Sequence, residues 1–168
     1  MKAKDNTVGL VLGGNLNDVP KTFDWALDEI GNLGVVQDKS GRYVSKAWGM
    51  DPDTPDFLNQ AVILVTDLNP AQLLAKLKDV ESSLGREVKT TGIGYHSRII
   101  DIDIIFYEDQ VIDLPELIVP HPRMHERKFV LKPLQEVAES WKHPLLNKSV
   151  SELLRECDDP LHVEKDQK

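Results

Sequence analysis

Cysteine is almost absent from this sequence: Cys157 is the only one among 168 residues. A lone cysteine excludes an intrachain disulfide framework and a cluster of thiolate metal ligands, since both need more than one. The fold must then rest on its hydrophobic core, and a chain of this length can bury a substantial one. We expect a single domain over residues 1–168, in a reducing compartment.

Long apolar runs and a basic excess are missing as well. No run approaches the roughly 20 residues of a membrane span, and residues 1–6 are polar, without a signal-peptide core. The chain has 20 Lys and Arg against 28 Asp and Glu, a formal net charge of −8, which argues against general nucleic-acid binding. We expect a cytoplasmic monomer that acts on small molecules, with neither nucleic acid nor membrane as a partner.

Two common nucleotide-binding motifs are also absent. A P-loop needs GxxxxGK[ST] and a dinucleotide fingerprint needs GxGxxG, and the chain contains neither. The turn Gly13-Gly14-Asn15, which follows the first predicted strand, matches neither pattern. If the protein binds ATP, it does so by another arrangement.

What is present is an alternation of strand and helix patterns. The apolar β-forming runs predict strands at 7–12, at 35–47 with a polar interruption at 38–41, at 57–66 and within 95–107. Helical spacing predicts one helix from a cap at Asn17 or Asp18 to a stop at Gly34, and another from Asn69 to Gly85. This order is that of an α+β, ferredoxin-like βαββαβ core with both helices on one face.

The C-terminal third predicts helical additions to that core. After a short strand at 111–112, a turn rich in cations leads into a short helix that we expect to end before Pro133. Ser149 and Glu152 form a capping-box pattern at the start of a last helix, and the charged end beyond it is expected to fray.

Two aspartates, Asp101 and Asp103, interrupt the most strongly β-forming run of the chain. Strand side chains alternate between faces, so the two carboxylates share a face, with Cα atoms roughly 6.5 to 7 Å apart. A cation between them would offset their repulsion, and hard oxygen ligands select Mg²⁺. The alternative is a solvated face, or an ion pair between Arg98 and Asp101.

The residues around this pair suit phosphoryl transfer, which needs cations to neutralise the phosphate charge. The candidate cations are Arg86, Lys89, Arg98, Arg123, Arg127 and Lys128. A second reading takes His121 and His125, at i and i+4 on a short helix, as ligands of a transition metal. A third is a ferredoxin-like binding module without chemistry, which the acidic charge disfavours.

Two further side chains suit a flat heterocycle. Trp48 lies in a Gly- and Pro-containing loop at 46–55, where it either binds a ligand or covers the edge of the core. Asn59 shares a strand face with Phe57, and its amide either reads a heterocyclic edge or makes a structural hydrogen bond. We expect this loop and the polar segment 86–97 to be mobile and to close over the substrates.

These motifs resemble 6-hydroxymethyl-7,8-dihydropterin pyrophosphokinase, an enzyme family of the folate pathway. The signature is Arg98-x-x-Asp101-Ile102-Asp103-Ile104-Ile105. Other segments resemble the family in order and approximate spacing: 13–16, 43–49, 56–62, 81–86, 119–121 and 127–129. The resemblance implies transfer of the β,γ-pyrophosphoryl group of ATP to the hydroxymethyl group of the pterin, with release of AMP and the use of two Mg²⁺.

The resemblance also implies roles for individual residues. Asp101 and Asp103 would hold both Mg²⁺ ions. The residues that would contact ATP are Arg98, His121 and Arg127 at the phosphates, with Glu81 and Arg86 flanking the nucleotide. The pterin pocket would consist of Ser45, Trp48, Phe57, Asn59, Tyr95 and Phe129.

The chain departs from the family pattern at three places. Gly14 stands where the family often has Ser, Ser45-Lys46-Ala47 stands in place of Thr-Pro-Pro, and Tyr95-His96-Ser97 stands in place of Trp-Gly-Pro. Some family members are fused to a neighbouring folate enzyme. At this length we expect an enzyme that stands alone.

Overall fold

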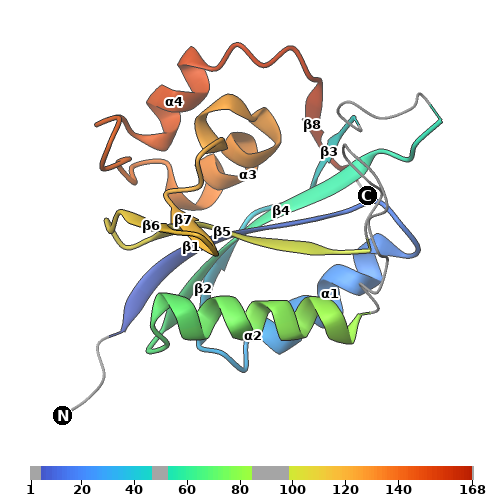
Figure 1. Ribbon diagram of the computed structural model, residues 1–168. Helices are drawn as coiled ribbons and strands as arrows, with labels where there is room; N and C mark the ends of the chain where they lie inside the picture. Colours follow the sequence, from blue (N-terminus) through green and yellow to red (C-terminus); the bar gives the residue numbers. More distant parts are fainter. Residues whose placement is uncertain (1–4, 47–52, 85–98, 168) are drawn as a thin grey trace.

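The computed structural model describes residues 5–46, 53–84 and 99–167 (Figure 1). Their elements in chain order are β1 (Asn6–Gly14), α1 (Val19–Ile30), β2 (Val35–Lys39), β3 (Tyr43–Ser45), β4 (Phe57–Thr66), α2 (Pro70–Ser83), β5 (Asp101–Tyr107), β6 (Ile112–Leu114), β7 (Leu117–Val119), the 3₁₀ turn η1 (Met124–Glu126), α3 (Lys128–Ala138), α4 (Val150–Glu156) and β8 (Val163–Lys165). None of the helices in these ranges is long and apolar enough to cross a membrane.

One antiparallel sheet carries the fold. Its order is β5-β1-β4-β3-β8. β3 pairs with the first residues of β4, 57–59, and β2 pairs with residues 62–65 of the same strand. β6 and β7 form a separate hairpin. This is the ferredoxin-like order that the sequence predicts, with the second predicted strand divided into β2 and β3. The division falls at the polar interruption, where Ser40 hydrogen-bonds to Ala61 through both its backbone N–H and its hydroxyl.

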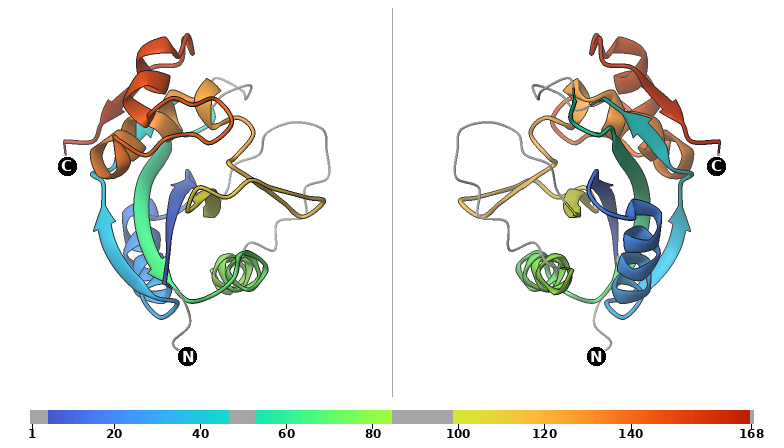
Figure 2. Two further views of the ribbon diagram at one scale, coloured as in Figure 1. Left: turned by 90° about the vertical axis from the view of Figure 1, so that its left-hand side faces the viewer. Right: turned by 90° about the vertical axis from the view of Figure 1, so that its right-hand side faces the viewer.

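Helices cover both faces of the sheet (Figures 1 and 2). α1 and α2 pack on one face, in a cluster with alternate β1 residues such as Leu10 and Leu12. α3 and α4 pack on the other face, around Val11, Ala61 and Ile63. The two clusters follow from strand alternation, because neighbours along β1 and β4 point to opposite faces.

A bulge between β1 and β5 changes which side chains reach each cluster. Gly9 pairs with Phe106 but Leu10 pairs with Ile104, so Ile105 is the extra residue. As a result Ile105 and Phe106 both pack on the α3 and α4 side, while Ile104 packs on the α1 and α2 side.

Two helix ends differ from the sequence prediction. α1 begins at the Asp18 cap as expected but ends at Gly31 rather than at Gly34. The Gly34 backbone lies close to β4: a Cβ there would be 2.2 Å from the Val65 carbonyl oxygen.

α3 does not end before Pro133 but continues through it to Ala138. Burial of the helix's apolar side, roughly 1.5–3 kcal/mol for each large side chain, outweighs the loss of about 3 kcal/mol at an internal proline.

The predicted frayed end is also wrong. Beyond α4, which begins with the expected Ser149 and Glu152 capping box, the chain returns to the sheet as β8 and pairs with β3. Val163 is 2% exposed, and its carbonyl accepts a hydrogen bond from the Lys132 ammonium at 2.6 Å. A buried valine and a satisfied carbonyl offset the entropy of ordering this short segment.

We expect Gly9→Ala to destabilise the fold. The new Cβ would lie 2.3 Å from Cε1 of Phe106, and this ring is stacked on Trp141 with centroids 4.3 Å apart, so it cannot move aside freely. Overpacking of this kind costs about 1–3 kcal/mol. Gly13→Ala is the matched control on the same strand face: its Cβ would make an ordinary 3.6 Å contact. Urea unfolding of both variants tests this, and equal stabilities would contradict it.

Candidate functional site

The strand register places a row of four residues across the α3 side of the sheet. Asp101 pairs with Gly13, Gly13 with Asn59, and Asn59 with Tyr43. Neighbouring strands are about 4.8 Å apart, so the Cα atoms of Asp101 and Asn59 are roughly 10 Å apart. Gly13 has no side chain, so the space between the carboxylate and the amide is not filled from the sheet.

The aspartate pair lies on this face, as alternation predicts. Asp103 pairs with Val11, one row further along from Asp101. Asp101 is half-buried and Asp103 exposed, while Ile102 and Ile104 between and beyond them are buried under α1 and α2. Two carboxylates on a partly open face keep part of their hydration, which lowers the cost of placing like charges side by side.

The chemistry of this donor set fits Mg²⁺. Within 5–46, 53–84 and 99–167 no group of three or more His, Cys, Asp or Glu side chains could hold a metal by itself. Mg²⁺ commonly takes one or two carboxylates and completes its shell with water and substrate phosphates. Asp101 and Asp103 therefore suit a metal that arrives with a phosphate ligand.

The structure contradicts the geometry on which the alternative transition-metal site depends, two histidines at i and i+4 on one helix. His121 precedes the turn that leads to η1, and His125 lies on η1, so the two do not share one face of a helix. The Nδ1 atom of His121 accepts a hydrogen bond from the Arg123 backbone N–H at 3.1 Å, so this nitrogen is already occupied.

His121 lies beside the aspartate strand as a neutral donor. Its backbone N–H donates to the Ile105 carbonyl of β5 at 2.8 Å. Burial, together with the charges of Arg127 and Arg123, lowers the pKa of His121 to about 4. With Nδ1 accepting, the proton of the neutral ring is on Nε2. The residue can thus donate one hydrogen bond to an anion at neutral pH.

Arg127 and Phe129 bring two predicted functions together. The Arg127 guanidinium lies 5.5 Å from the centre of the Phe129 ring, in cation–π geometry. Phe129 is on the first turn of α3 and packs against the cluster that includes Val11 and Ala61, on the aspartate side of the sheet. A cation predicted to bind phosphate and an aromatic ring predicted to contact the pterin are therefore immediate neighbours.

Ser45 and Asn59 form one hydrogen-bonded unit. The Asn59 amide nitrogen donates to the Ser45 hydroxyl at 2.8 Å and to the Tyr43 carbonyl at 3.2 Å. The amide is 3% exposed, and its Oδ1 is the nearest atom to the space above Gly13. One of the two alternatives for Asn59, a structural hydrogen bond, is therefore present. Because the amide nitrogen is held by β3, the amide oxygen Oδ1 faces the space above Gly13. Phe57 pairs with Ser45 on the same face.

The remaining predicted residues divide into two groups. Glu81 is 5% exposed in the last turns of α2, a helix that packs on the opposite face from Asp101. Its contact with a nucleotide stays a prediction. Trp48, Arg86, Tyr95 and Arg98 lie outside the described residues, as do segment 86–97 and most of the predicted loop at 46–55.

Two residues of the row were not predicted as site residues. The sequence predicts a turn at Gly13 and a strand through Tyr43, and both lie in segments that resemble the family, 13–16 and 43–49, but it gives neither residue a role in the site. The signal that identifies them is the pairing register, which a single sequence does not contain. The start of α3 shows the same limit: the Lys128 backbone N–H there donates to the Asp159 carboxylate, 31 residues later in the chain, at 3.1 Å.

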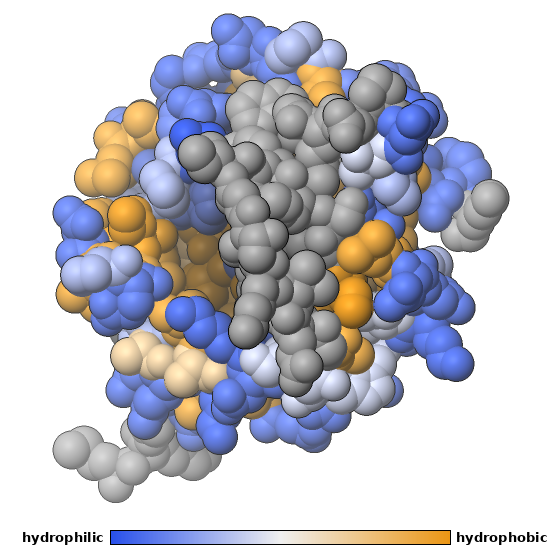
Figure 3. Space-filling model, turned by 45° about the vertical axis from the view of Figure 1, so that its right-hand side comes forward, coloured by the Kyte–Doolittle hydropathy of each residue, from blue (hydrophilic) through white to orange (hydrophobic). Residues whose placement is uncertain are grey.

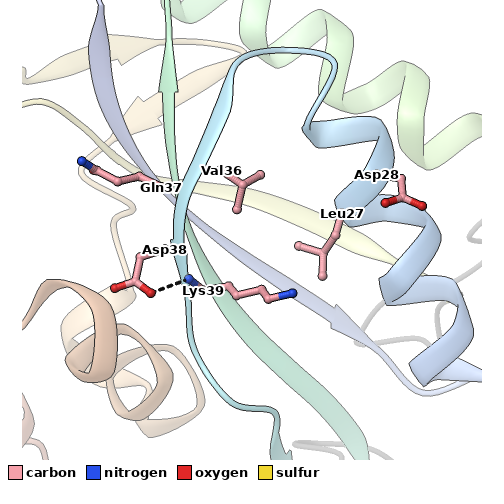
Figure 4. Close-up of a pocket in the computed structure, with 6 residues that line it drawn as sticks. All are labelled: Leu27, Asp28, Val36, Gln37, Asp38 and Lys39. Carbon is pink, nitrogen blue, oxygen red and sulfur yellow. Dashed lines mark hydrogen bonds between the residues drawn. The ribbon is translucent and has the colours of Figure 1, made fainter.

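One pocket lies away from this row (Figure 4). It has a volume of about 470 Å³ and lies between α1 and β2, where Asp38 accepts a hydrogen bond from the Lys39 backbone N–H at 2.8 Å. Its lining residues are Leu27, Asp28, Val36, Gln37, Asp38 and Lys39. β2 pairs with residues 62–65 of β4, whereas Asn59 is near the other end of that strand. None of the predicted site residues that the structure describes lines it.

Figure 3 shows one face of the molecule. Among its coloured residues hydrophilic ones predominate, and the hydrophobic atoms gather in separate patches. Three exposed apolar side chains, Val111, Leu114 and Ile118, belong to the β6–β7 hairpin or adjoin it. Exposed apolar side chains are a normal part of a globular surface.

Comparisons with known proteins agree on one family. The model of the 7,8-dihydro-6-hydroxymethylpterin-pyrophosphokinase (HPPK) family matches residues 9–139. A 2-amino-4-hydroxy-6-hydroxymethyldihydropteridine pyrophosphokinase of Synechocystis sp. is 35% identical over 149 residues, covering 88% of this chain and 74% of its own. The protein of the same name from Porphyromonas gingivalis is 39% identical over 139 residues, covering 82% and 93%.

A solved structure supports the fold. A crystal structure of Plasmodium falciparum HPPK-DHPS superposes with a TM-score of 0.72 at 19% identity. The match covers 92% of this chain but only 44% of the longer one. At this identity the likeness concerns the fold alone.

Acid should destabilise the protein through His121. Its pKa is about 4 in the folded chain and about 6.5 in an unfolded one, so between these values the unfolded state binds more protons and stability falls as the pH falls. Between pH 7 and 4.5 this residue accounts for about 2 kcal/mol. The free energy of unfolding of His121→Gln should therefore fall by about 2 kcal/mol less than that of the wild type between pH 7 and 4.5. His162→Gln replaces an exposed histidine and should lose as much stability as the wild type. Urea unfolding at both pH values measures it; identical losses in all three proteins would refute the assignment.

Proposed function

The chain belongs to the 7,8-dihydro-6-hydroxymethylpterin-pyrophosphokinase family, and from this membership we propose how its residues divide the reaction between them. The enzyme transfers pyrophosphate from ATP to 6-hydroxymethyl-7,8-dihydropterin in folate synthesis. Removal of the β- and γ-phosphates from ATP leaves AMP. The observation that carries the proposal is the row across the sheet, in which Asp101 and Asn59 face the same space above Gly13.

Asp101 and Asp103 hold two Mg²⁺ ions in this proposal. Bound Mg²⁺ supplies charge neutralisation at the phosphates of ATP. The two carboxylates are spaced by alternation on one strand, so the rigid sheet, rather than a loop, fixes their separation. A donor set fixed in this way does not need to reorganise when the charge on the phosphates shifts during transfer.

His121 and Arg127 bind the phosphates from the other side. His121 is neutral with a proton on Nε2, so it donates without adding a full charge, and Arg127 supplies the positive charge. We assign Arg98 to the phosphates and Glu81 and Arg86 to the flank of the nucleotide from the family pattern alone.

The pterin binds at the Asn59 end of the row. Asn59 Oδ1 accepts a hydrogen bond from an N–H on the edge of the heterocycle, while Ser45 and Tyr43 hold the amide nitrogen. Phe57 and Phe129 lie on the same side of the sheet and supply aromatic contact. Trp48 and Tyr95 complete the pocket by the family pattern.

We further propose that residues 1–168 act as a single-domain, cytoplasmic monomer without nucleic acid. The formal net charge of −8 supports the last point, because nucleic-acid binders usually carry a basic excess. On the face drawn in Figure 3 the hydrophobic atoms form separate patches and no continuous apolar area among the coloured residues, which supports a monomer.

Loss of one carboxylate should reduce turnover without unfolding the protein. Asp103→Asn and Asp101→Asn keep the side-chain shape and remove one charge, so we expect turnover to fall at least about 10²-fold, the scale of one preorganised electrostatic group. Stability without Mg²⁺ should stay equal or rise slightly, because a repulsion is removed. AMP formation from ATP and the pterin measures turnover, and ADP as the product would indicate an ordinary kinase. Near-wild-type turnover in either variant would refute the two-metal assignment; a large stability loss in both would favour a structural role.

Gly13→Ala should weaken binding of the pterin without weakening that of ATP. The methyl group would lie 3.6 Å from Asn59 Oδ1, in the space between the amide and Asp101. We expect the KM for the pterin to rise about tenfold, since a misplaced methyl group of this size costs about 1–3 kcal/mol in a fitted pocket. The KM for ATP should change less than about twofold. A parallel rise in both KM values would count against this position for the pterin.

A further inference from the structure

We propose that Glu136 is a positioning residue for the Asn59 amide, acting through Tyr43 and strand β3 from outside the substrate pocket. This inference rests on the proposed function, in which Asn59 reads the edge of the pterin. Glu136 lies on α3 and has no place among the residues that the family pattern assigns.

The Glu136 carboxylate accepts hydrogen bonds from two other segments, residues 41–43 and β8. Its Oε1 accepts from the Lys165 ammonium of β8 at 2.9 Å, and its Oε2 accepts from the Tyr43 hydroxyl of β3 at 3.1 Å. The Gly41 backbone N–H, just before β3, donates to both oxygens at 3.2 and 3.3 Å. One carboxylate therefore joins α3, β3 and β8.

The protonation behaviour of the cluster agrees with a fixed anion. Burial raises the pKa of Glu136, but hydrogen bonds from Lys165, Gly41 and Tyr43 outweigh it, and the net effect is a lowered pKa. Burial, with the hydrogen bond and charge of Glu136, raises the pKa of Tyr43 to about 12. At neutral pH the anion and its phenol donor are both present.

The same strand that Glu136 holds also orients Asn59. Tyr43 is the direct pairing partner of Asn59, and its carbonyl accepts one of the two hydrogen bonds from the amide nitrogen. Ser45, two residues along β3, accepts the other. β3 has only three residues, and a strand this short depends on its neighbours for its position. A shift of β3 would therefore turn the amide and move Oδ1 away from the row.

β8 supports β3 from its other edge. It pairs with β3 residue for residue from Tyr43 to Ser45 (Figure 1), and α3 holds it at two points one helical turn apart, Lys132 and Glu136. β8 lies beyond the segment 9–139 that the family model matches. The C-terminal strand thus extends the support of the pterin end of the site.

The variants that test this inference are Glu136→Gln, which removes the charge, and the milder Tyr43→Phe, which removes only the hydroxyl. The matched control is Glu156→Gln. Glu156 is the last residue of α4, and its carboxylate also forms an ion pair with a lysine, Lys148, at 2.5 Å, but away from β3. We expect both test variants to raise the KM for the pterin about three- to tenfold, the scale of one ordinary hydrogen bond, because they act on the amide through β3 and remove no contact with the pterin itself. The KM for ATP and kcat should change less than about twofold, and the control should match the wild type.

A double-mutant cycle separates positioning from general stability. In an Asn59→Ala background the amide is gone, so Glu136→Gln should produce no further rise in the KM for the pterin. The Asn59 side-chain amide signals in ¹⁵N spectra of the free protein should shift in Glu136→Gln and stay unchanged in Glu156→Gln.

Three outcomes would overturn the inference. They are an equal rise in the KM for the pterin in both backgrounds, a parallel rise in the KM for ATP, and no effect of Asn59→Ala on the KM for the pterin. A wild-type protein that forms no AMP from ATP and the pterin would instead refute the function, so the two failures can be told apart.

Discussion

The pairing of β1 with both of its neighbours is the constraint on which the rest of the site depends. β1 lies between β4 and β5 and is antiparallel to each. Side chains alternate between faces along a strand, so a slip of one residue would send each β1 side chain to the wrong face, and the two hydrophobic clusters forbid it. Gly13 therefore lies between Asp101 and Asn59, and strand spacing fixes the distance between the proposed metal-binding and pterin-binding ends.

The site uses this rigid frame to place charges that would otherwise be unfavourable together. In the proposed function the two aspartates of β5 hold the metal ions on the phosphates, while Arg127 and a neutral His121 bind the phosphate oxygens. Burial, together with the charges of Arg127 and Arg123, lowers the pKa of His121, which leaves one directed hydrogen-bond donor instead of another cation. The arrangement is complementary to a polyphosphate with bound divalent cations.

α3 and the segment after it, including β8, hold the short strand β3 in place. α3 packs on the sheet and at the same time ties β8 and β3 to it through Lys132 and Glu136. Asp159 accepts from the first backbone N–H of the same helix. Segments far apart in the sequence therefore hold the short strand that carries Ser45.

The sequence by itself determined the core order of strands and helices, the shared face of Asp101 and Asp103, and the caps of α1, α2 and α4. These features are local, because alternation, capping residues and apolar spacing act over a few residues. The family signature added the function for the same reason, since its motifs are short and keep their order.

Only the tertiary structure decided which residues from different strands face one another. The row from Asp101 through Gly13 to Asn59 depends on register, and the extension of α3 through Pro133 and the pairing of β8 depend on burial against the sheet. These outcomes come from contacts between distant segments, whose free energies outweigh the local preferences that the sequence shows. A proline that locally predicts a helix end, and a charged tail that locally predicts fraying, are both overruled in this way.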